Sequence, residues 1–522
     1  MNEKEKYGSF VLLLIIISTI IRSLLAATLE LGNDEVYYVL YARYPDWSHF
    51  DHPLMVGLVI QLFSLDLLFE SEFFIRLSSI VFGAINIWLI YQIGKTIKNE
   101  KVGLIAAILY VSSVYATVIA GIFILPDTPQ SLFWLLSILL MIRVLPLEPG
   151  DARVKRWMLL LGISLGLGII SKYTTVFLWF GMGLYFILFR RDWLRSPYVY
   201  VAALLSLIIA SPILIWNYQN DWISFVFHGS RVNSIGFNID FHYFFRELFG
   251  QILYNNPINF LLIVLSLFAF FNGKLYLKNA YLQIIILTSL PLIATFLIIS
   301  LTRATLPHWT APSYTTLILI AAVWLDQIKS QMIRKTFLIS SSSLLLLTLL
   351  LGFLQINFGI ISFNDDKHYN KLGSNDISLD MIGFEQTGSA FAKIYANDVR
   401  NGVMDKHSIM VGDNWFPLAN YDFYVASPLG MNSFGIGGLD HIHKYAWINK
   451  INGGFKKGMD AYYISDSRYY REPGEQITSC FESVEIADTI QIYRNNKIVK
   501  RAFVYRLKNM IEVPADLLTE AP

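Results

Sequence analysis

The sequence has only one cysteine, Cys480, and only 15% of its 522 residues are charged. A single cysteine excludes an intramolecular disulfide framework. The charged fraction lies well below the roughly 25% of a soluble domain, while 55% of the residues are hydrophobic. The net charge of +2 is too small to indicate a nucleic-acid partner. The composition therefore predicts an integral membrane protein that does not bind nucleic acid.

Long apolar runs predict a polytopic α-helical membrane protein with about eleven transmembrane helices, counted as windows able to cross a bilayer of about 30 Å. Their expected ranges are 8–28, 73–94, 102–123, 128–145, 157–171, 173–189, 198–216, 252–271, 281–301, 309–325 and 336–356. The first run lacks a convincing small-residue cleavage site, so we expect a retained anchor. Only "SKY" separates the fifth and sixth ranges, and a re-entrant hairpin would give the same pattern.

The basic residues predict the orientation, because cytoplasmic loops carry an excess of lysine and arginine. With the N-terminus inside, the cytoplasmic loops hold most of these residues, including Lys95, Lys98 and Lys101. An odd number of spans then places everything after about residue 357 outside. We therefore expect a multi-pass protein of the inner (plasma) membrane, whose C-terminal part faces the periplasm or the exterior.

The C-terminal part differs from the rest in its composition. It begins with the polar stretch "FNDDKHYNKLGSNDISLD" and continues with the helical pattern "TGSAFAKIYANDVRN" and the strand-like runs "HSIMV", "AYYIS" and "SVEIADTIQIYR". A segment of this length can hold its own core. The sequence therefore predicts a transmembrane domain over residues 1–356 and an extracytoplasmic α/β domain over residues 357–522.

Ionisable residues gather in the loops predicted for the outer face of the membrane. Each has an ordinary explanation, such as a helix cap for an acidic residue, snorkelling for a lysine, or an interfacial anchor for a histidine next to a tryptophan. Charges at membrane depth cost about 2.5–3.5 kcal/mol each on insertion scales, so their coincidence on one face favours a shared site. These residues are Asp34, Glu35, Asp51, Asp127, Lys172, Arg303 and His308, which Trp309 follows directly.

Carboxylates and cations at a membrane surface suit the transfer of a group from a lipid-linked phosphate. A carboxylate can deprotonate the incoming hydroxyl, and cations can stabilise the charge that grows on the departing phosphate. The sequence has no Walker-type or Rossmann glycine pattern. A lipid-phosphate donor requires neither pattern.

Four motifs occur in order in these loops: "DEVYYVLYARYPDWSHFDHPLMVGLV", "LPDTPQSLFW", "GLGIISKYTTVFL" and "LPHWTAPSY". Together they resemble the bacterial polyprenyl-phosphate-sugar-dependent GT-C glycosyltransferases, which include protein O-mannosyltransferases and lipid A aminoarabinose transferases. The resemblance spans roughly residues 10–325. It implies a GT-C fold and transfer of a sugar from undecaprenyl phosphate, or a similar carrier, to lipid A, the lipopolysaccharide core, a glycan or a protein.

The resemblance also implies roles for individual residues. Asp34 would be the catalytic base, Glu35 would support it or contact the acceptor, and Asp127 would be a second acidic residue in the same cavity. Lys172 would meet the lipid phosphate. Arg22 lies in the outer half of the first span, where an arginine needs a partner, and we expect that partner to be Asp34 or the donor phosphate.

The segment "FDHP" occupies the slot of an acidic-basic-Pro-Pro sequence in the aminoarabinose transferases. By this resemblance, Asp51 is the candidate ligand of a divalent metal, Mg²⁺, Mn²⁺ or Zn²⁺, and His52 would approach the phosphate. Here Leu54 stands in place of the second proline, and a histidine replaces the basic residue. His308 and Trp309 would lie on the acceptor side.

Two further regions are candidates for contacts with substrate. The segment 217–251 interleaves aromatic residues with His228 and Arg246, which predicts a partly amphipathic outer segment that lies on the membrane. The resemblance implies that such a loop can cover the site, while interfacial anchoring explains the same pattern. In the tail, Asp413 and Trp415 follow a predicted strand, as sugar contacts or simply as a polar turn. The tail itself would cap the membrane cavity and help select the acceptor.

The predicted reaction is a single displacement with inversion at the anomeric carbon. The alternatives are a flippase of lipid-linked sugars and a non-catalytic scaffold of an envelope complex. A flippase should have ionisable residues near mid-membrane and related halves, whereas the charges here gather at one surface. A scaffold would leave the arrangement of the four loops unexplained.

Overall fold

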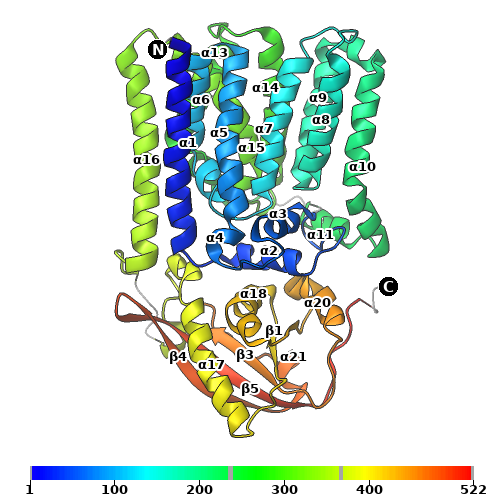
Figure 1. Cartoon of the computed structure of the whole chain (residues 1–522), viewed down its shortest axis with the longest axis vertical. Coiled ribbons are helices and arrows are strands. Elements are labelled where there is room, and N and C mark those ends of the chain that lie inside the picture. The colour runs from blue at the N-terminus through cyan, green and yellow to red at the C-terminus, as the bar shows by residue number, and fades with distance from the viewer. Residues whose placement is uncertain (1–2, 233–238, 364–367, 519–522) are drawn as a thin grey trace. The chain divides into compact units, whose positions relative to one another are not determined.

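The computed structural model describes residues 3–232, 239–363 and 368–518, and the chain divides into two compact units (Figure 1). The first unit, formed by residues up to Ala27 and by Pro45–Thr348, consists of helices. The second unit combines Thr28–Tyr44 with the chain from Leu349 onward and contains a β-sheet. The expected domain boundary near residue 357 stays a prediction. The sequence did not indicate that Thr28–Tyr44 groups with the C-terminal residues.

A helix lies at each position where the sequence predicts a span. Of the described residues, five helices are long and apolar enough to cross a membrane, and the bent pair of α12 (Phe241–Tyr254) and α13 would make a sixth. The chain is therefore a helical membrane protein, while the count of eleven spans stays a prediction. The helices at the expected positions are α1 (Glu3–Thr28), α5 (Leu77–Ile97), α6 (Glu100–Val111), α7 (Asp127–Val144), α8 (Val154–Ile169), α9 (Val176–Phe189), α10 (Pro197–Gln219), α13 (Pro257–Phe271), α14 (Asn279–Ile299), α15 (Ala311–Gln327) and α16 (Gln331–Phe358).

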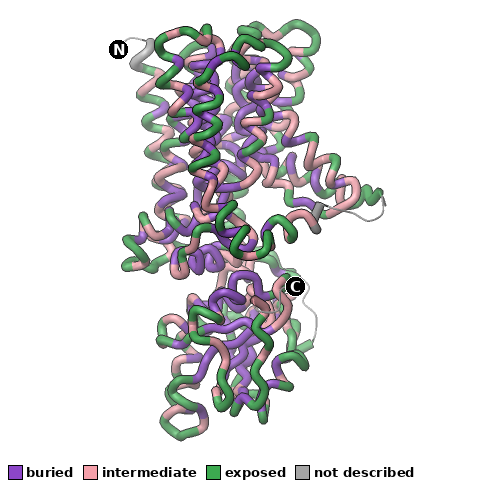
Figure 2. The backbone as a smooth tube through the Cα atoms, turned by 90° about the vertical axis from the view of Figure 1, so that its right-hand side faces the viewer, coloured by how far each residue is buried: buried purple, intermediate pink, exposed green. Residues whose placement is uncertain are grey.

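The core of the first unit surrounds α15, in which every residue from Ala311 to Val323 is buried. A helix that is buried on all sides is typical of a central position, and α15 packs against α6, α13 and α14. Outer helices behave differently, since α1 exposes apolar side chains such as Leu12 and Ile20. Figure 2 shows buried residues inside the helical unit and exposed ones along its outer helices. Such apolar outer faces suit contact with lipid.

Short elements connect the helices of the first unit and shape its loops. They are α3 (Met55–Ser64), α4 (Glu72–Ile75), the π-helical turn η1 (Tyr115–Ile119), the 3₁₀ turns η2 (Tyr173–Thr175), η3 (Arg191–Arg195) and η4 (Pro307–Thr310), and α11 (Ile223–Val232). Residues 233–238 of the predicted amphipathic segment lie outside the described residues.

The second unit is built on a five-stranded mixed sheet with the order β2-β1-β3-β5-β4. β1 runs parallel to β2 and β3, whereas β5 runs antiparallel to β3 and β4. The three predicted strand-like runs correspond to β1, β3 and β4, which confirms the α/β character of the tail. The strands are β1 (Ile409–Gly412), β2 (Ser433–Gly435), β3 (Ala461–Asp466), β4 (Phe481–Arg494) and β5 (Lys497–Met510), and the helices are α17 (Phe384–Arg400), α18 (Trp415–Tyr421), α19 (Leu439–Ile442), α20 (Tyr445–Ile451) and α21 (Glu475–Thr478).

The segment after α1 forms helix α2 (Asn33–Arg43), which packs within the second unit. The backbone amide of Leu31 donates a hydrogen bond of 2.7 Å to the Tyr424 hydroxyl. The Tyr37 ring lies 4.9 Å from the Trp415 ring. The residues from Glu35 to Ala42 are all buried. The stretch expected as an outer loop therefore contains a buried helix that groups with the second unit.

Candidate active site

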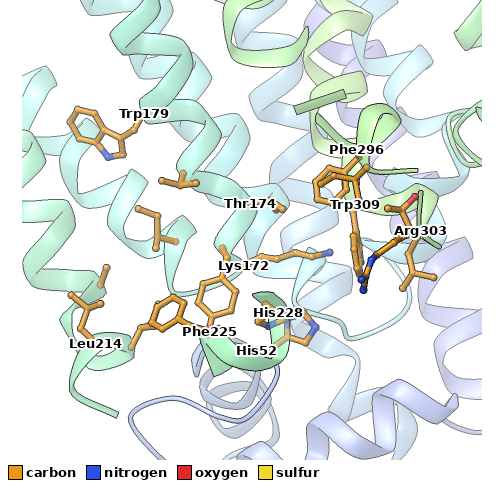
Figure 3. Close-up of a pocket in the computed structure, with 18 of the residues that line it drawn as sticks. His52, Lys172, Thr174, Trp179, Leu214, Phe225, His228, Phe296, Arg303 and Trp309 are labelled. Atoms are coloured by element: carbon orange, nitrogen blue, oxygen red, sulfur yellow. The ribbon is translucent and has the colours of Figure 1, made fainter. Parts of the chain in front are cut away.

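The first unit contains a cavity of 1290 Å³, which is lined by residues of α8 to α12, α14, η2 and η4. Most of the lining residues are apolar. The basic residues and histidines in its wall are His52, Lys172, His228 and Arg303. Figure 3 shows Trp179 and Leu214 lying apart from these four residues. The cavity therefore has a charged region and a separate apolar region.

Lys172 is the buried cation of this cavity. Its Nζ atom lies 2.7 Å from Oδ2 of Asp127, and both side chains are buried. The Tyr115 hydroxyl, on the π-helical turn η1, donates to Oδ1 of Asp127 at 3.1 Å. Asp127 begins α7, where the helix dipole also favours a negative charge. The structure thus brings Asp127 and Lys172 together as an ion pair, of which Lys172 lines the cavity.

The turn that carries Lys172 is fixed by its neighbours. Gln130 on α7 donates to the Thr174 hydroxyl at 2.7 Å, and the backbone amide of Met55 donates to the Ile170 carbonyl at 3.2 Å. A Cβ atom at Gly168 would lie 2.6 Å from Cγ2 of Thr175, so glycine permits the tight return of the chain after α8. These contacts hold the lysine and the "FDHP" segment in the same part of the unit.

Two histidines from distant parts of the sequence meet at the cavity. The rings of His52 and His228 lie 6.4 Å apart. Nε2 of His228 lies 2.8 Å from the Asp51 carbonyl oxygen, and its ring packs edge-on against Tyr173 at 5.4 Å. The structure therefore places His52, a predicted phosphate contact, in the wall beside Lys172 (Figure 3).

The loop between α14 and α15 forms another side of the site. Arg303 and Trp309 line the cavity, and the Trp309 ring packs against Phe296 at 5.4 Å. His308 lies near enough to Asp127 and Lys172 to interact with both electrostatically, and its ring lies 5.9 Å from Tyr254. The predicted acceptor-side residues thus belong to the same constellation as the predicted phosphate-binding lysine.

Burial keeps the two histidines of this constellation uncharged at neutral pH. It lowers the pKa of His52 to about 3. Burial likewise lowers the pKa of His308 to about 4, against the opposing effect of Asp127 and with a further contribution from Lys172. An unperturbed histidine has a pKa near 6.5. The lysine and the arginine among the described lining residues are Lys172 and Arg303.

Arg22 is fully buried inside the helical unit. Its Nη2 atom lies 3.4 Å from the Ala116 carbonyl oxygen and 3.5 Å from the Thr117 hydroxyl. A Cβ atom at Gly83 would lie 2.3 Å from Nη1, so the glycine makes room for the guanidinium. Arg22 does not occur among the described residues that line the cavity. Its contact with Asp34 or with phosphate stays a prediction.

Asp34 and Glu35 lie in the first turn of α2, in the second unit. Asp34 is exposed, whereas Glu35 is buried and its Oε2 accepts a hydrogen bond of 2.8 Å from the Gly32 amide. Glu35 therefore pairs the backbone amide of the N-cap residue Gly32 and so fixes the start of the helix. The role of Asp34 as catalytic base stays a prediction.

Among residues 3–232, 239–363 and 368–518, no group of three or more His, Cys, Asp or Glu side chains could hold a metal ion. Asp51 as a metal ligand stays a prediction.

Sequence reasoning did not assign His228, Tyr173 or Phe296 to the site. His228 was visible only as one polar residue in an aromatic-rich segment, a pattern that interfacial anchoring produces equally well. Tyr173 could have been predicted as a site residue, because it directly follows Lys172 in the sequence. Phe296 lies inside an apolar run and carries no signal of its own.

The chain resembles known proteins more in its structure than in its sequence. A family profile described as "Dolichyl-phosphate-mannose-protein mannosyltransferase" matches residues 51–216. No curated protein sequence gives a significant match. ArnT from Cupriavidus metallidurans bound to undecaprenyl phosphate is 13% identical, with a TM-score of 0.62 over 95% of this chain and 98% of that chain. The apo form of that protein gives a TM-score of 0.63 at 13% identity, over 96% of this chain and 98% of that chain.

The chain has a GT-C glycosyltransferase fold. This confirms the resemblance drawn from the motifs. The archaeal oligosaccharyltransferase AglB from Archaeoglobus fulgidus, in complex with an inhibitory peptide and a dolichol-phosphate, is a more distant match at 11% identity, with a TM-score of 0.50 over 88% of this chain and 69% of that chain. The profile match contains Asp51, His52, Asp127 and Lys172. These four residues therefore lie in the part of the GT-C fold that is also recognisable by sequence.

Proposed function

We propose that this protein transfers a sugar from a polyprenyl-phosphate donor to a hydroxyl group of an envelope acceptor. The main observation behind this proposal is the 1290 Å³ cavity, whose wall is largely apolar and also contains the cations Lys172 and Arg303. An isoprenoid chain requires apolar surroundings, and its phosphate requires cationic donors. The fold shared with an ArnT that was crystallised with undecaprenyl phosphate supports this proposal.

In this proposal, Lys172 binds the donor phosphate and Asp127 is a positioning residue. A lysine ammonium has three N–H donors. One of them is directed to Asp127 at 2.7 Å, which holds the side chain in place and leaves the others for phosphate oxygens. The Tyr115 hydrogen bond fixes Asp127 in turn. Such preorganised charge stabilises a leaving group without reorganisation during the reaction. The neutral imidazole of His52 can donate one further hydrogen bond to the phosphate.

The chemical step is a displacement at the anomeric carbon. Asp34 accepts the proton of the acceptor hydroxyl, the acceptor oxygen forms a bond to the anomeric carbon, and the bond from that carbon to the phosphate oxygen breaks. The phosphate leaves with the electron pair, stabilised by Lys172 and Arg303. One displacement inverts the anomeric configuration. Glu35 supports Asp34 by capping the turn that carries it.

The remaining assignments complete the proposal. His308 and Trp309 lie on the acceptor side, Arg22 contributes to the donor side, and Asp51 is the candidate ligand of a divalent metal, although no step above depends on a metal. The protein has eleven spans in the inner membrane, and its active site and second unit face the periplasm or the exterior. The acceptor is lipid A, the lipopolysaccharide core, a glycan or a protein.

Sugar transfer in proteoliposomes tests the proposal. We expect label to leave one member of a panel of radiolabelled polyprenyl-phosphate sugars with the native protein, and Asp34→Asn to slow this transfer about 10²–10⁴-fold, since that is the usual contribution of a general base. Asp66→Asn, which changes an exposed aspartate after α3, is the matched control and should retain transfer. Substantial turnover in Asp34→Asn would refute the base assignment. Label that crosses the bilayer while still attached to its lipid would replace the transferase with a flippase.

A further inference from the structure

Helix α12 buries polar side chains and exposes apolar ones. Its buried residues are Glu247 and Gln251, which are both fully buried. A surface helix of a soluble protein shows the reverse arrangement, whereas an apolar outer face suits a helix that meets lipid. Ionisable groups buried in such surroundings are costly and usually serve a specific contact. The exposed apolar residues of α12 are Phe241, Phe245, Phe249 and Leu253.

The carboxylate of Glu247 accepts a hydrogen bond at each of its oxygens. The Thr305 hydroxyl donates to Oε2 at 2.7 Å, and the side-chain amide of Gln251 donates to Oε1 at 2.7 Å. Gln251 is held in turn by the Tyr314 hydroxyl, which donates to its Oε1 at 2.6 Å. Both partners of the carboxylate are neutral. Burying a carboxylate beside neutral partners costs free energy, which favours a role for Glu247 beyond packing.

The hydrogen bond from Thr305 connects Glu247 to the wall of the 1290 Å³ cavity. Thr305 and Arg303 both line this cavity. The backbone amide of Arg303 donates to the Ile299 carbonyl at the end of α14, at 3.1 Å. Arg303 therefore lies between two fixed points of the chain, and the bond from Thr305 to Glu247 supplies the second of them.

Two further contacts join α12 to the loop 303–309. Nη2 of Arg246 donates to the Thr305 carbonyl at 3.2 Å. A Cβ atom at Gly250 would lie 2.2 Å from Cγ of Pro307, so the glycine lets the loop approach the helix closely. The loop is thus attached to α12 at Thr305 and at Pro307.

We infer that Glu247 is a positioning residue, which holds the loop 303–309 so that Arg303 faces the cavity. It acts through Thr305 rather than by contact with the substrate. Loss of its hydrogen bonds would release the loop from α12 close to Arg303, and ordering the guanidinium on a phosphate would then cost more entropy. One point rests on the proposed function: the contact between Arg303 and the donor phosphate.

Binding of polyprenyl phosphate and of polyprenol to the full-length protein in detergent, measured by native mass spectrometry, tests this inference. The two lipids differ only in the phosphate. Glu247→Leu removes both hydrogen bonds and keeps most of the side-chain volume. We expect it to weaken binding of polyprenyl phosphate about tenfold, as for one lost hydrogen bond to a charged group, and to leave binding of polyprenol unchanged.

Two further variants support this comparison. Thr305→Val removes only the hydrogen bond between the loop and Glu247, and it should weaken polyprenyl phosphate to a similar extent. Glu148→Leu, at an exposed position between α7 and α8, is the control and should change neither affinity. Unchanged binding of polyprenyl phosphate in both Glu247→Leu and Thr305→Val would overturn the inference.

A double-mutant cycle separates positioning from a purely structural role. Arg303→Ala should weaken binding of polyprenyl phosphate by at least as much as Glu247→Leu. The double variant should bind no more weakly than Arg303→Ala alone, because the effect of Glu247 passes through Arg303. A structural role instead predicts losses that add in the double variant, or an equal loss for both lipids. Either result would overturn the inference.

The same measurements distinguish this inference from the proposed function. A native protein that binds both lipids equally would refute the proposed donor together with the inference. A preference for the phosphate that survives Glu247→Leu would refute the inference alone. Because no sugar is present, a failure of sugar transfer would leave these results intact.

Discussion

Each unit contains an ion pair with an N–O distance of 2.7 Å around a buried carboxylate, but the surroundings of the two pairs differ. In the first unit, Lys172 bonds to Asp127 and also lines the cavity. In the second unit, Arg506 donates one hydrogen bond of 2.7 Å to each carboxylate oxygen of Asp398, and the Tyr462 hydroxyl donates to the same carboxylate at 2.8 Å. The second pair joins α17 to the sheet, and both oxygens of its carboxylate are bonded within the unit. In the first pair, one N–H group of Lys172 bonds to Asp127, and the other two can bind a ligand.

The difference shows that the same contact can serve stability in one place and ligand binding in another. Desolvation makes either pair costly to break. Lys172 of the first pair lines the cavity, so we expect loss of the first pair to affect activity separately from folding. The four predictions below separate these effects, in order of decreasing size.

Removing the cation from the first pair should have the largest effect. Lys172→Met leaves the buried Asp127 without its counter-ion, which should cost about 3–5 kcal/mol of unfolding free energy and abolish sugar transfer. The double variant Lys172→Met/Asp127→Asn should recover stability but not transfer. Thermal unfolding in detergent and transfer in proteoliposomes measure the two quantities. Recovery of transfer in the double variant would show that Lys172 does not bind phosphate.

Breaking the second pair should reduce stability alone. Asp398→Ala removes the buried carboxylate that bonds both Arg506 and Tyr462, and leaves Arg506 with the exposed Glu485 alone, which should cost about 3 kcal/mol. The transfer rate per folded molecule should stay unchanged below the melting transition. Glu485→Ala removes only the exposed partner of Arg506 at 3.4 Å and should cost less than about 1 kcal/mol. A loss of transfer without a loss of stability in Asp398→Ala would contradict the comparison.

Truncating a side chain in the apolar wall of the cavity should weaken binding of the donor's isoprenoid chain rather than of its phosphate. Trp179→Ala should raise the KM for a long polyprenyl donor about tenfold, equivalent to ~1.4 kcal/mol of lost apolar contact, and should change the KM for a short-chain donor much less. Phe180→Ala alters the next residue of α9, which is exposed and does not line the cavity among the described residues. Equal effects on both chain lengths would contradict this reading of the cavity.

The histidines of the first unit should give the effect that is smallest at neutral pH, because it is a dependence of stability on pH that develops only below about pH 6.5. The pKa of His308 falls to about 4 in the folded state and lies near 6.5 in the unfolded state. Between these two pH values, the unfolded state therefore binds more protons than the folded state. Stability should therefore be complete above pH 6.5 and decline as the pH falls toward 4. His308→Gln should flatten the melting temperature over this range, and addition of His52→Gln should flatten it further. An unaltered slope in the double variant would contradict the burial of both rings.

Much of the first unit could be predicted, because membrane helices are encoded by local apolar runs. One predicted span begins too early, and the reason is local. The span expected from residue 252 begins as α13 at Pro257, after Asn256 with φ of +67°, because a residue before proline avoids the helical conformation. Lys172 could be found for a similar reason, since a lysine between two apolar runs is anomalous wherever it occurs.

The remainder depends on contacts between distant residues. Nothing near Tyr37 indicates that its ring packs against Trp415, so the sequence could not show that α2 belongs to the second unit. His228 reaches the Asp51 carbonyl from another loop, and neither neighbourhood contains a motif for this contact. Local patterns predict elements, but pairings between elements require the folded chain.

The placement of α2 has a consequence for biosynthesis. Leu31 and Tyr424, which share a hydrogen bond, are separated by 393 positions. At a synthesis rate of 5–20 residues per second, the ribosome needs about 20–80 s to produce the partner. During that time the tyrosine side chains of α2, which are buried in the folded chain, lack their partners from the C-terminal part of the second unit. We expect the membrane surface or a chaperone to shield this helix until the C-terminal part of the chain has been synthesised.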